Sequence, residues 1–152
     1  MSTTTTTTDW RDELIASTPG LQDPKAVRYV LLGVEDREWA AELVRRWVPT
    51  FPEPVAAEVP AWATQADKWR WVTVDDVWQR TVSRPFRWAE GGGFDVVATQ
   101  EASADETVTT PRPEIMVDLA DDTINNAADG RTFGQWLIEA ADVLDRIEGV
   151  AR

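Results

Sequence analysis

The stretch TFGQWLIEAADVLDRIEG, residues 132–149, carries the clearest structural signal in this sequence. Its apolar side chains recur with the period of about 3.6 residues that marks one face of a helix. They are Phe133, Trp136, Leu137, Ala140, Ala141, Leu144 and Ile147. Thr132 and Gln135 match a T-x-x-Q capping box, and Gly149 stands where a helix commonly ends. We therefore predict a long C-terminal helix over residues 133–148 that packs one face on another layer.

The middle of the chain predicts strands that would supply this second layer. KWRWVTV (68–74) alternates and is rich in β-formers, and EIMVDL (114–119) is apolar at every second residue. RPFRWAE (84–90) and FDVVATQE (94–101) flank three glycines and predict a β-hairpin. We interpret ASADETVTTPRP, which precedes the last strand, as a mobile connection.

Between the first strand and the hairpin, the sequence VDDVWQRTV predicts a short helix. Thr73 would cap this helix, with Val74, Val77 and Trp78 facing inward and Asp76 at the capping-box position.

The N-terminal part predicts three helices after a disordered threonine-rich tail, residues 1–8. The first would be capped by Thr8 or Asp9, and the second begins at the Asp-Pro pair 23–24. EDREWAAELVRRW (35–47) has the apolar period of a third helix, with acids in its first turn and arginines in its last.

These elements predict an α+β fold: N-terminal helices, a small antiparallel sheet and a long C-terminal helix packed on the sheet. A chain of 152 residues fits one domain. We predict a single domain over residues 9–152, with a helical part (9–48), a Pro-rich linker (49–60) and a mixed part (61–152).

Composition limits the chemistry available to this chain. There is no cysteine and no histidine, which excludes thiolate nucleophiles, zinc sites of the Cys/His kind and the Ser-His-Asp triad. We therefore expect no metal or other cofactor. The net charge of −12 opposes direct binding to nucleic acid. No apolar run is long enough to span a membrane, and we expect a cytoplasmic protein. The oligomeric state is not predicted.

The stretch PAWATQADKWRWVTVDDVW (60–78) holds four of the nine tryptophans. Helical spacing assigns four tryptophans of the chain to the core: Trp39, Trp47, Trp78 and Trp136. Trp69 and Trp71 share one side of the predicted strand, whereas Arg70 points to the other and Trp62 lies in a Pro-bounded loop. We predict that Trp62, Trp69, Arg70 and Trp71 form a protein-binding surface for a peptide, a proline-rich segment or a partner's arginine. The alternative is that these rings pack under the Pro-rich linker.

The acids of the C-terminal helix suggest a different hypothesis. Glu139, Asp142, Asp145 and Glu148 recur at steps of three opposite the apolar stripe. Successive acids would rise by about 4.5 Å, a spacing on the scale of DNA phosphates. A DNA-mimic inhibitor is therefore one alternative, and a solvated face of a core helix is the simpler one. A carboxylate-dependent enzyme of unknown substrate is a third.

The segments VPAWATQADKW, PEIMVDL and FGQWLIEAADVLDRI resemble small uncharacterised proteins of actinobacteria and their phages. Those proteins carry a Pro-x-Trp-Cys segment with a nearby histidine, then strands and a closing Ala-Ala-Asp-x-Leu helix. The resemblance covers about residues 59–148, and its cysteine and histidine positions are Ala63 and Ala66 here. A metal site implied by that pattern cannot form in this chain. We predict a small acidic accessory protein of an actinobacterium or its phage, non-catalytic and acting through contacts with another protein.

Overall fold

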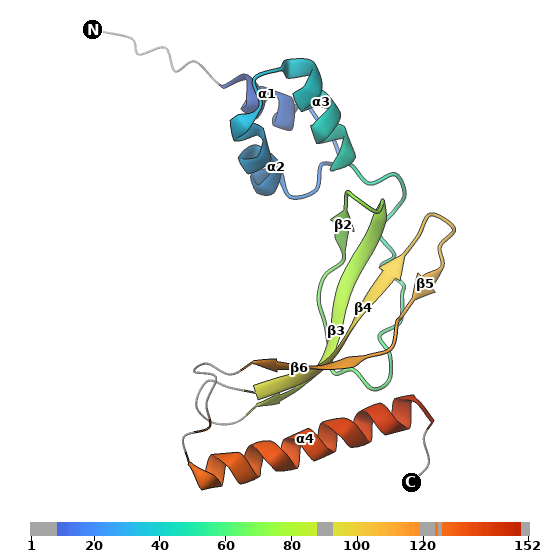
Figure 1. Ribbon diagram of the computed structural model, residues 1–152. Helices are drawn as coiled ribbons and strands as arrows, with labels where there is room; N and C mark the ends of the chain where they lie inside the picture. Colours follow the sequence, from blue (N-terminus) through green and yellow to red (C-terminus); the bar gives the residue numbers. More distant parts are fainter. Residues whose placement is uncertain (1–8, 88–92, 119–123, 125, 150–152) are drawn as a thin grey trace, which may run out of the picture. The chain divides into compact units, whose positions relative to one another are not determined.

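The structure is a computed structural model that describes residues 9–87, 93–118, 124 and 126–149 (Figure 1). The predicted tail, residues 1–8, lies outside the described residues. Internal contacts divide the chain into two compact units. We call them the helical unit (Met1–Glu53 with Arg70–Trp78) and the sheet unit (Pro54–Trp69 with Gln79–Arg152). The boundary at Glu53 falls inside the predicted linker, and residues 70–78 of the predicted mixed part belong to the helical unit.

The helical unit contains the predicted N-terminal helices. They are α1 (Trp10–Ala16), α2 (Pro24–Val30) with the 3-10 turn η1 (Leu31–Gly33), and α3 (Arg37–Arg46). The side chains of Asp9, Asp23 and Asp36 cap the three α-helices, as acids before a first turn are expected to do. The buried core of this unit consists of Val27, Leu31, Ala40 and Val44.

Trp39 does not belong to that core, so this part of the prediction is wrong. Its side chain is 50% exposed, whereas Ala40 and Val44, spaced by four residues, face inward. Trp47 was assigned correctly, since it packs against the same core. The predicted stripe on α3 was wider than the face that the helix buries.

Six strands within the described residues belong to one antiparallel sheet with the order β1-β3-β4-β5, in which β2 also pairs with β3 and β6 with β4. The strands are β1 (Gln65–Ala66), β2 (Arg70–Val72), β3 (Val77–Arg87), β4 (Gly93–Ala102), β5 (Val108–Thr109) and β6 (Glu114–Asp118). The predicted hairpin is present as β3 and β4, although its tip, residues 88–92, lies outside the described residues. The segment predicted as a connection contains β5.

The predicted helix VDDVWQRTV is wrong, because strand β3 begins within it at Val77. Trp78 and Val82 are both buried, which fits the two-residue period of a strand. Thr73 and its neighbours form a turn, where Asp76 has a positive φ of 51°. Trp78 is buried as predicted, but a strand and not a helix places it there.

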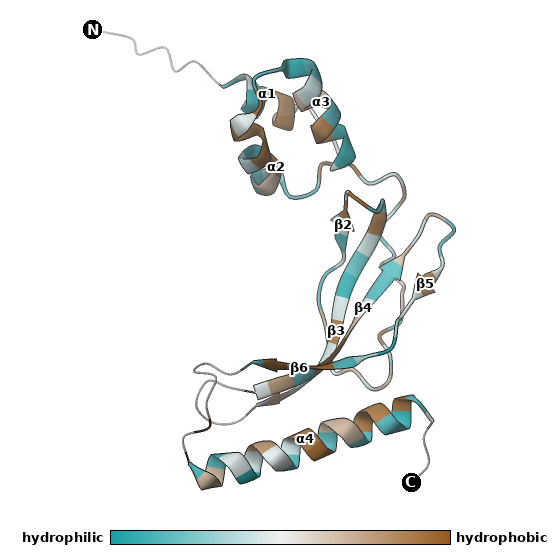
Figure 2. Cartoon of the chain, viewed as in Figure 1, coloured by the Kyte–Doolittle hydropathy of each residue, from teal (hydrophilic) through white to brown (hydrophobic). Residues whose placement is uncertain are grey.

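The C-terminal helix α4 (Ala127–Ile147) lies along one face of the sheet, as predicted, and its hydrophobic and hydrophilic residues alternate along the ribbon (Figures 1 and 2). Its core joins residues of both layers: Phe94 and Val96 of β4, and Ala140 and Val143 of α4. Trp136 packs against this core, which confirms its assignment, whereas Leu137 of the predicted stripe is 38% exposed.

The start of α4 differs from the prediction. The Asn126 side chain accepts a hydrogen bond from the Asp129 amide at 2.9 Å and caps the helix. Thr132, the predicted cap, lies one turn inside and donates to the Ala128 carbonyl at 3.1 Å. The end is as predicted: Gly149 has a φ of +69° and donates its amide to the Arg146 carbonyl.

Candidate functional site

Trp71 belongs to the interior of the helical unit. Its side chain is 3% exposed, and its indole N–H donates to the Arg46 carbonyl at 3.0 Å. The ring makes edge-on contacts with Phe51 at 5.3 Å and with Trp78 at 5.5 Å. Trp78 in turn donates its indole N–H to the Phe51 carbonyl at 3.1 Å. We call Phe51, Trp71 and Trp78 the aromatic cluster; its two indoles are buried, so neither offers a binding surface.

Trp69 is also buried, at 8% exposure, within the sheet unit. The Arg80 guanidinium lies over its ring, 4.5 Å from the ring centre. An arginine of a partner protein would stack on the indole at this position, but the chain's own Arg80 already occupies it. Burial lowers the pKa of Arg80, although an arginine stays charged at neutral pH.

Arg80 connects the Trp69 ring to the Pro-rich segment. Its Nε donates to the Gln100 side chain at 2.8 Å, and its terminal nitrogen donates to the Ala57 carbonyl at 2.9 Å. Gln100, 3% exposed, donates onward to the Glu58 carbonyl at 3.2 Å and to the Thr110 hydroxyl at 2.9 Å. Residues 57 and 58 are thus held against the sheet.

Trp62, Trp69, Arg70 and Trp71 therefore do not form one exposed surface, because two of the three rings are buried. The strand alternation was correct, because Trp69 and Trp71 are both buried and Arg70 between them is exposed. The side that was predicted to meet solvent is the buried one, since each indole gains more by burial than by exposure. Of the three predicted rings, Trp62 alone is only partly buried.

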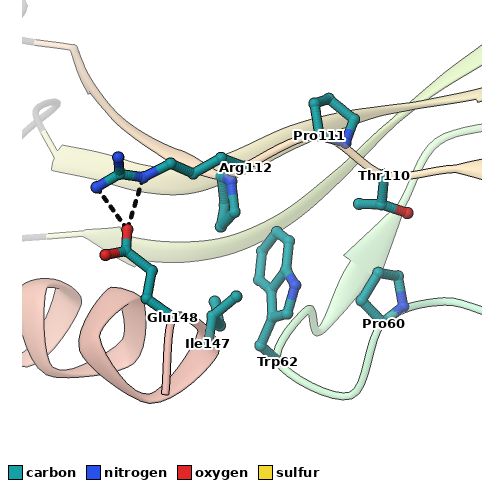
Figure 3. Close-up of a pocket in the computed structure, with 8 residues that line it drawn as sticks. Pro60, Trp62, Thr110, Pro111, Arg112, Ile147 and Glu148 are labelled. Carbon is teal, nitrogen blue, oxygen red and sulfur yellow. Dashed lines mark hydrogen bonds and ion pairs between the residues drawn. The ribbon is translucent and has the colours of Figure 1, made fainter. Parts of the chain in front are cut away.

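Trp62 lies in an open hollow of about 420 Å³ in the sheet unit (Figure 3). The residues that line it are Pro60, Trp62, Thr110, Pro111, Arg112, Pro113, Ile147 and Glu148. Figure 3 shows the indole between Ile147 of α4 and Pro60 of the segment before β1. Trp62 also packs against the core shared by the sheet and α4, which holds the ring in a fixed position. We call this site the Trp62 hollow.

An ion pair between Arg112 and Glu148 lies at the rim of the Trp62 hollow. Two nitrogens of Arg112 approach the same carboxylate oxygen of Glu148, each at 2.6 Å. The Arg112 side chain is 78% exposed, so its guanidinium is accessible from solvent. Sequence reasoning missed Pro111, Arg112 and Pro113, although two prolines around an arginine could have suggested a rigid, ordered edge.

A second hollow, of about 540 Å³, lies on the helical unit. Its lining residues are Asp12, Ile15, Ala16, Pro24, Lys25, Arg28, Tyr29 and Leu32. Tyr29 is 77% exposed and Leu32 is 60% exposed. Sequence reasoning missed this surface as well, although KAVRYVLLGV contains more apolar residues than one buried face requires.

Neither hollow brings together the two carboxylates that a carboxylate-dependent enzyme requires. The Trp62 hollow has Glu148, paired with Arg112, and the second hollow has Asp12, whose oxygen lies 2.6 Å from Arg28. Among the described residues, two acids outside the hollows have a shifted pKa. The pKa of Asp9 is lowered first by a hydrogen bond from the Arg11 amide, and that of Asp105 by one from the Ser103 hydroxyl. Both shifts favour a structural carboxylate over a proton donor.

The acidic face of α4 is partly engaged within the chain. Glu148 pairs with Arg112, and Glu139 accepts a hydrogen bond from Gln135 at 3.2 Å. Asp142 and Asp145 are half-buried, and each interacts with another group. These contacts differ from a row of free acids, so α4 adds no support to the DNA-mimic alternative, which stays a prediction.

The fold and the hollows define a small acidic α+β protein with an apolar, tryptophan-containing surface depression. Comparison with models of protein families, with curated proteins and with solved structures finds no match for this chain. The resemblance to actinobacterial and phage proteins therefore stays a prediction. In the described part of the chain, no helix is long and apolar enough to cross a membrane.

Proposed function

We propose that this protein is a non-catalytic interaction protein that binds a short extended segment of another protein in the Trp62 hollow. One observation carries the proposal: the half-buried Trp62 ring lies in a hollow with three prolines in its lining. Proline and tryptophan side chains have few torsions to fix when a ligand binds. They therefore offer apolar contact area at little cost in conformational entropy.

The lining favours a peptide over a small polar substrate. Most of the wall is apolar, and its charged groups form one exposed ion pair, Arg112 with Glu148. An extended peptide would place an apolar side chain against Trp62. One of its polar groups would interact with this ion pair. We also propose that the protein acts in the cytoplasm, since a chain without cysteine gains nothing from an oxidising compartment.

The test uses the chain labelled with 5-fluorotryptophan, so that each indole gives a fluorine NMR signal. The Trp62 signal is assigned as the one that Trp62→Phe removes. The probe is a peptide selected from a random display library on the unlabelled protein. We expect the peptide to move the Trp62 signal but not the Trp71 signal, and Trp62→Phe to weaken binding roughly tenfold.

The matched control is Tyr29→Ala, which changes the second hollow and should leave peptide affinity unchanged. If the selected peptides leave the Trp62 signal in place, or lose affinity through Tyr29→Ala instead, the proposed site is wrong.

A further inference from the structure

Strand β6 has an open edge. β4 pairs antiparallel with β6 from Gly93↔Asp118 to Val97↔Glu114, and β5 pairs with β4 further along, at Glu101↔Thr109. In the part of the chain that the structure describes, β4 is the sole strand paired with β6. Among the described residues, the other edge of β6 thus has no strand partner, and an edge of this kind can accept an added strand.

The side chains of β6 are unusually apolar for an open edge. Met116 is 53% exposed and Val117 is 51% exposed, and Figure 2 shows the strand in brown over most of its length. Natural edge strands are commonly protected by charged side chains, a proline or a bulge, and β6 carries charges only at its two ends. β6 has none of these between Glu114 and Asp118, and its register with β4 is continuous over all five residues.

Acids surround the exposed methionine. Glu114, Met116 and Asp118 alternate along β6 and so share one face of the sheet. Asp95 of β4 lies directly opposite Met116 and adds a third carboxylate to that face. A strand added beside β6 would meet an apolar centre with an acid on each side.

This charge pattern indicates which kind of strand can pair with the open edge of β6. In a pairing of β6 with β6 of a second copy over its full length, centred on Met116, Glu114 would face the second copy's Asp118 at both ends. Directly opposed like charges destabilise a strand pair, so the pattern disfavours self-association. Lysine or arginine at the same two positions would instead pair with Glu114 and Asp118.

We propose that the open edge of β6 binds an extended segment of a partner protein by strand addition. The segment carries an apolar residue opposite Met116 and basic residues opposite Glu114 and Asp118. The net charge of −12 would also steer a basic segment toward this protein. The edge consists of Glu114–Asp118, which follow directly on residues 110–113 of the Trp62 hollow but do not line it. Either proposal can therefore fail while the other holds.

The probe is the end-blocked peptide Thr-Lys-Val-Leu-Val-Lys-Thr, added to the full ¹⁵N-labelled chain and followed by NMR. Antiparallel addition places its two lysines opposite Asp118 and Glu114. We expect the largest amide shifts at residues 114–118. We also expect weaker binding at higher salt, and affinity reduced on the order of tenfold for the same peptide with glutamate in place of both lysines.

The deciding variant is the double change Glu114→Lys and Asp118→Lys, which leaves Met116 and the strand pattern in place. Reversed charges should reverse the preference, so that this variant binds the glutamate peptide more tightly than the lysine peptide. The Tyr29→Ala chain, changed in the other unit, should bind as the unchanged protein does.

Three outcomes would overturn the proposal. The variant could keep the original preference, or the peptide could shift amides other than 114–118. The unchanged protein could also show concentration-dependent shifts at 114–118 without peptide, in which case a second copy occupies the edge.

Discussion

Trp71 and Trp62 come from the same tryptophan-rich stretch but have different surroundings. Trp71 is buried in the helical unit, donates its indole N–H to a carbonyl and contacts two aromatic rings. Trp62 is half-buried in the sheet unit, where its ring lies in an open hollow beside prolines. The comparison shows that a cluster of tryptophans in sequence is no single site. Burial and the partners of the indole distinguish a structural ring from one available for binding.

The largest effect is expected where the ring is structural. Trp71→Ala removes a buried indole from the aromatic cluster, and we expect the free energy of unfolding to fall by about 3–5 kcal/mol. Urea denaturation followed by circular dichroism measures this loss. The control is Tyr29→Ala in the same unit, where a side chain 77% exposed should change stability by about 0.5 kcal/mol or less. Equal losses for both variants would show that Trp71 is not a core residue.

A smaller effect is expected at the start of α4, in the sheet unit. Asn126→Ala removes the cap that accepts the Asp129 amide, and we expect a loss of about 1 kcal/mol. Thr132→Ala should change stability by about 0.5 kcal/mol or less, because Thr132 lies inside the helix. Thermal unfolding of the two variants compares them directly. A larger loss for Thr132→Ala would place the start of the helix at residue 133 instead.

The smallest effect is a pH dependence in the helical unit. The Arg11 amide, and then the Arg11 and Arg28 side chains, hold the pKa of Asp9 below its ordinary value of 3.8. A carboxyl with a depressed folded-state pKa stabilises the fold above the unfolded-state pKa. This contribution is lost as the pH falls through the folded-state pKa, so it should weaken below about pH 3.8.

Asp9→Asn provides the measurement for this pH dependence. The urea midpoints of the unchanged chain and of the variant should differ at about pH 6 and converge toward about pH 2. A difference that stays constant over that range would assign the role of Asp9 to capping alone.

Helix boundaries were predictable where a cap and an apolar period coincide. Asp23 before Pro24 and Gly149 after α4 were both placed correctly from sequence. The start of α4 was missed because Gly130 and Gly134 lower helix propensity in its first turns, while Thr132 and Gln135 imitate a capping box. Local patterns cannot show which of two possible caps the tertiary packing selects.

The site was predictable only in part. Alternation along KWRWVTV correctly separated Trp69 and Trp71 from Arg70, but it could not tell which side meets solvent. For Trp69 the burial depends on Arg80 of strand β3, whose guanidinium covers the ring, and for Trp71 it depends on contacts with Phe51 and Trp78. The hollow around Trp62 also brings Pro60 next to residues 110–113 and 147–148, and a single sequence does not show such proximity.

The aromatic cluster has a consequence for how the chain folds as it is synthesised. Phe51 belongs to the first continuous stretch of the helical unit, whereas Trp71 and Trp78 reach that unit in a separate stretch, Arg70–Trp78. When the helical stretch up to Glu53 has left the ribosome, Phe51 still lacks the two indoles that it contacts, because Pro54–Trp69 of the sheet unit comes next in the chain. A nascent chain ending before residue 70 would therefore leave the Phe51 ring and the Arg46 carbonyl without their indole partners, and a fragment ending at Glu53 would never acquire them.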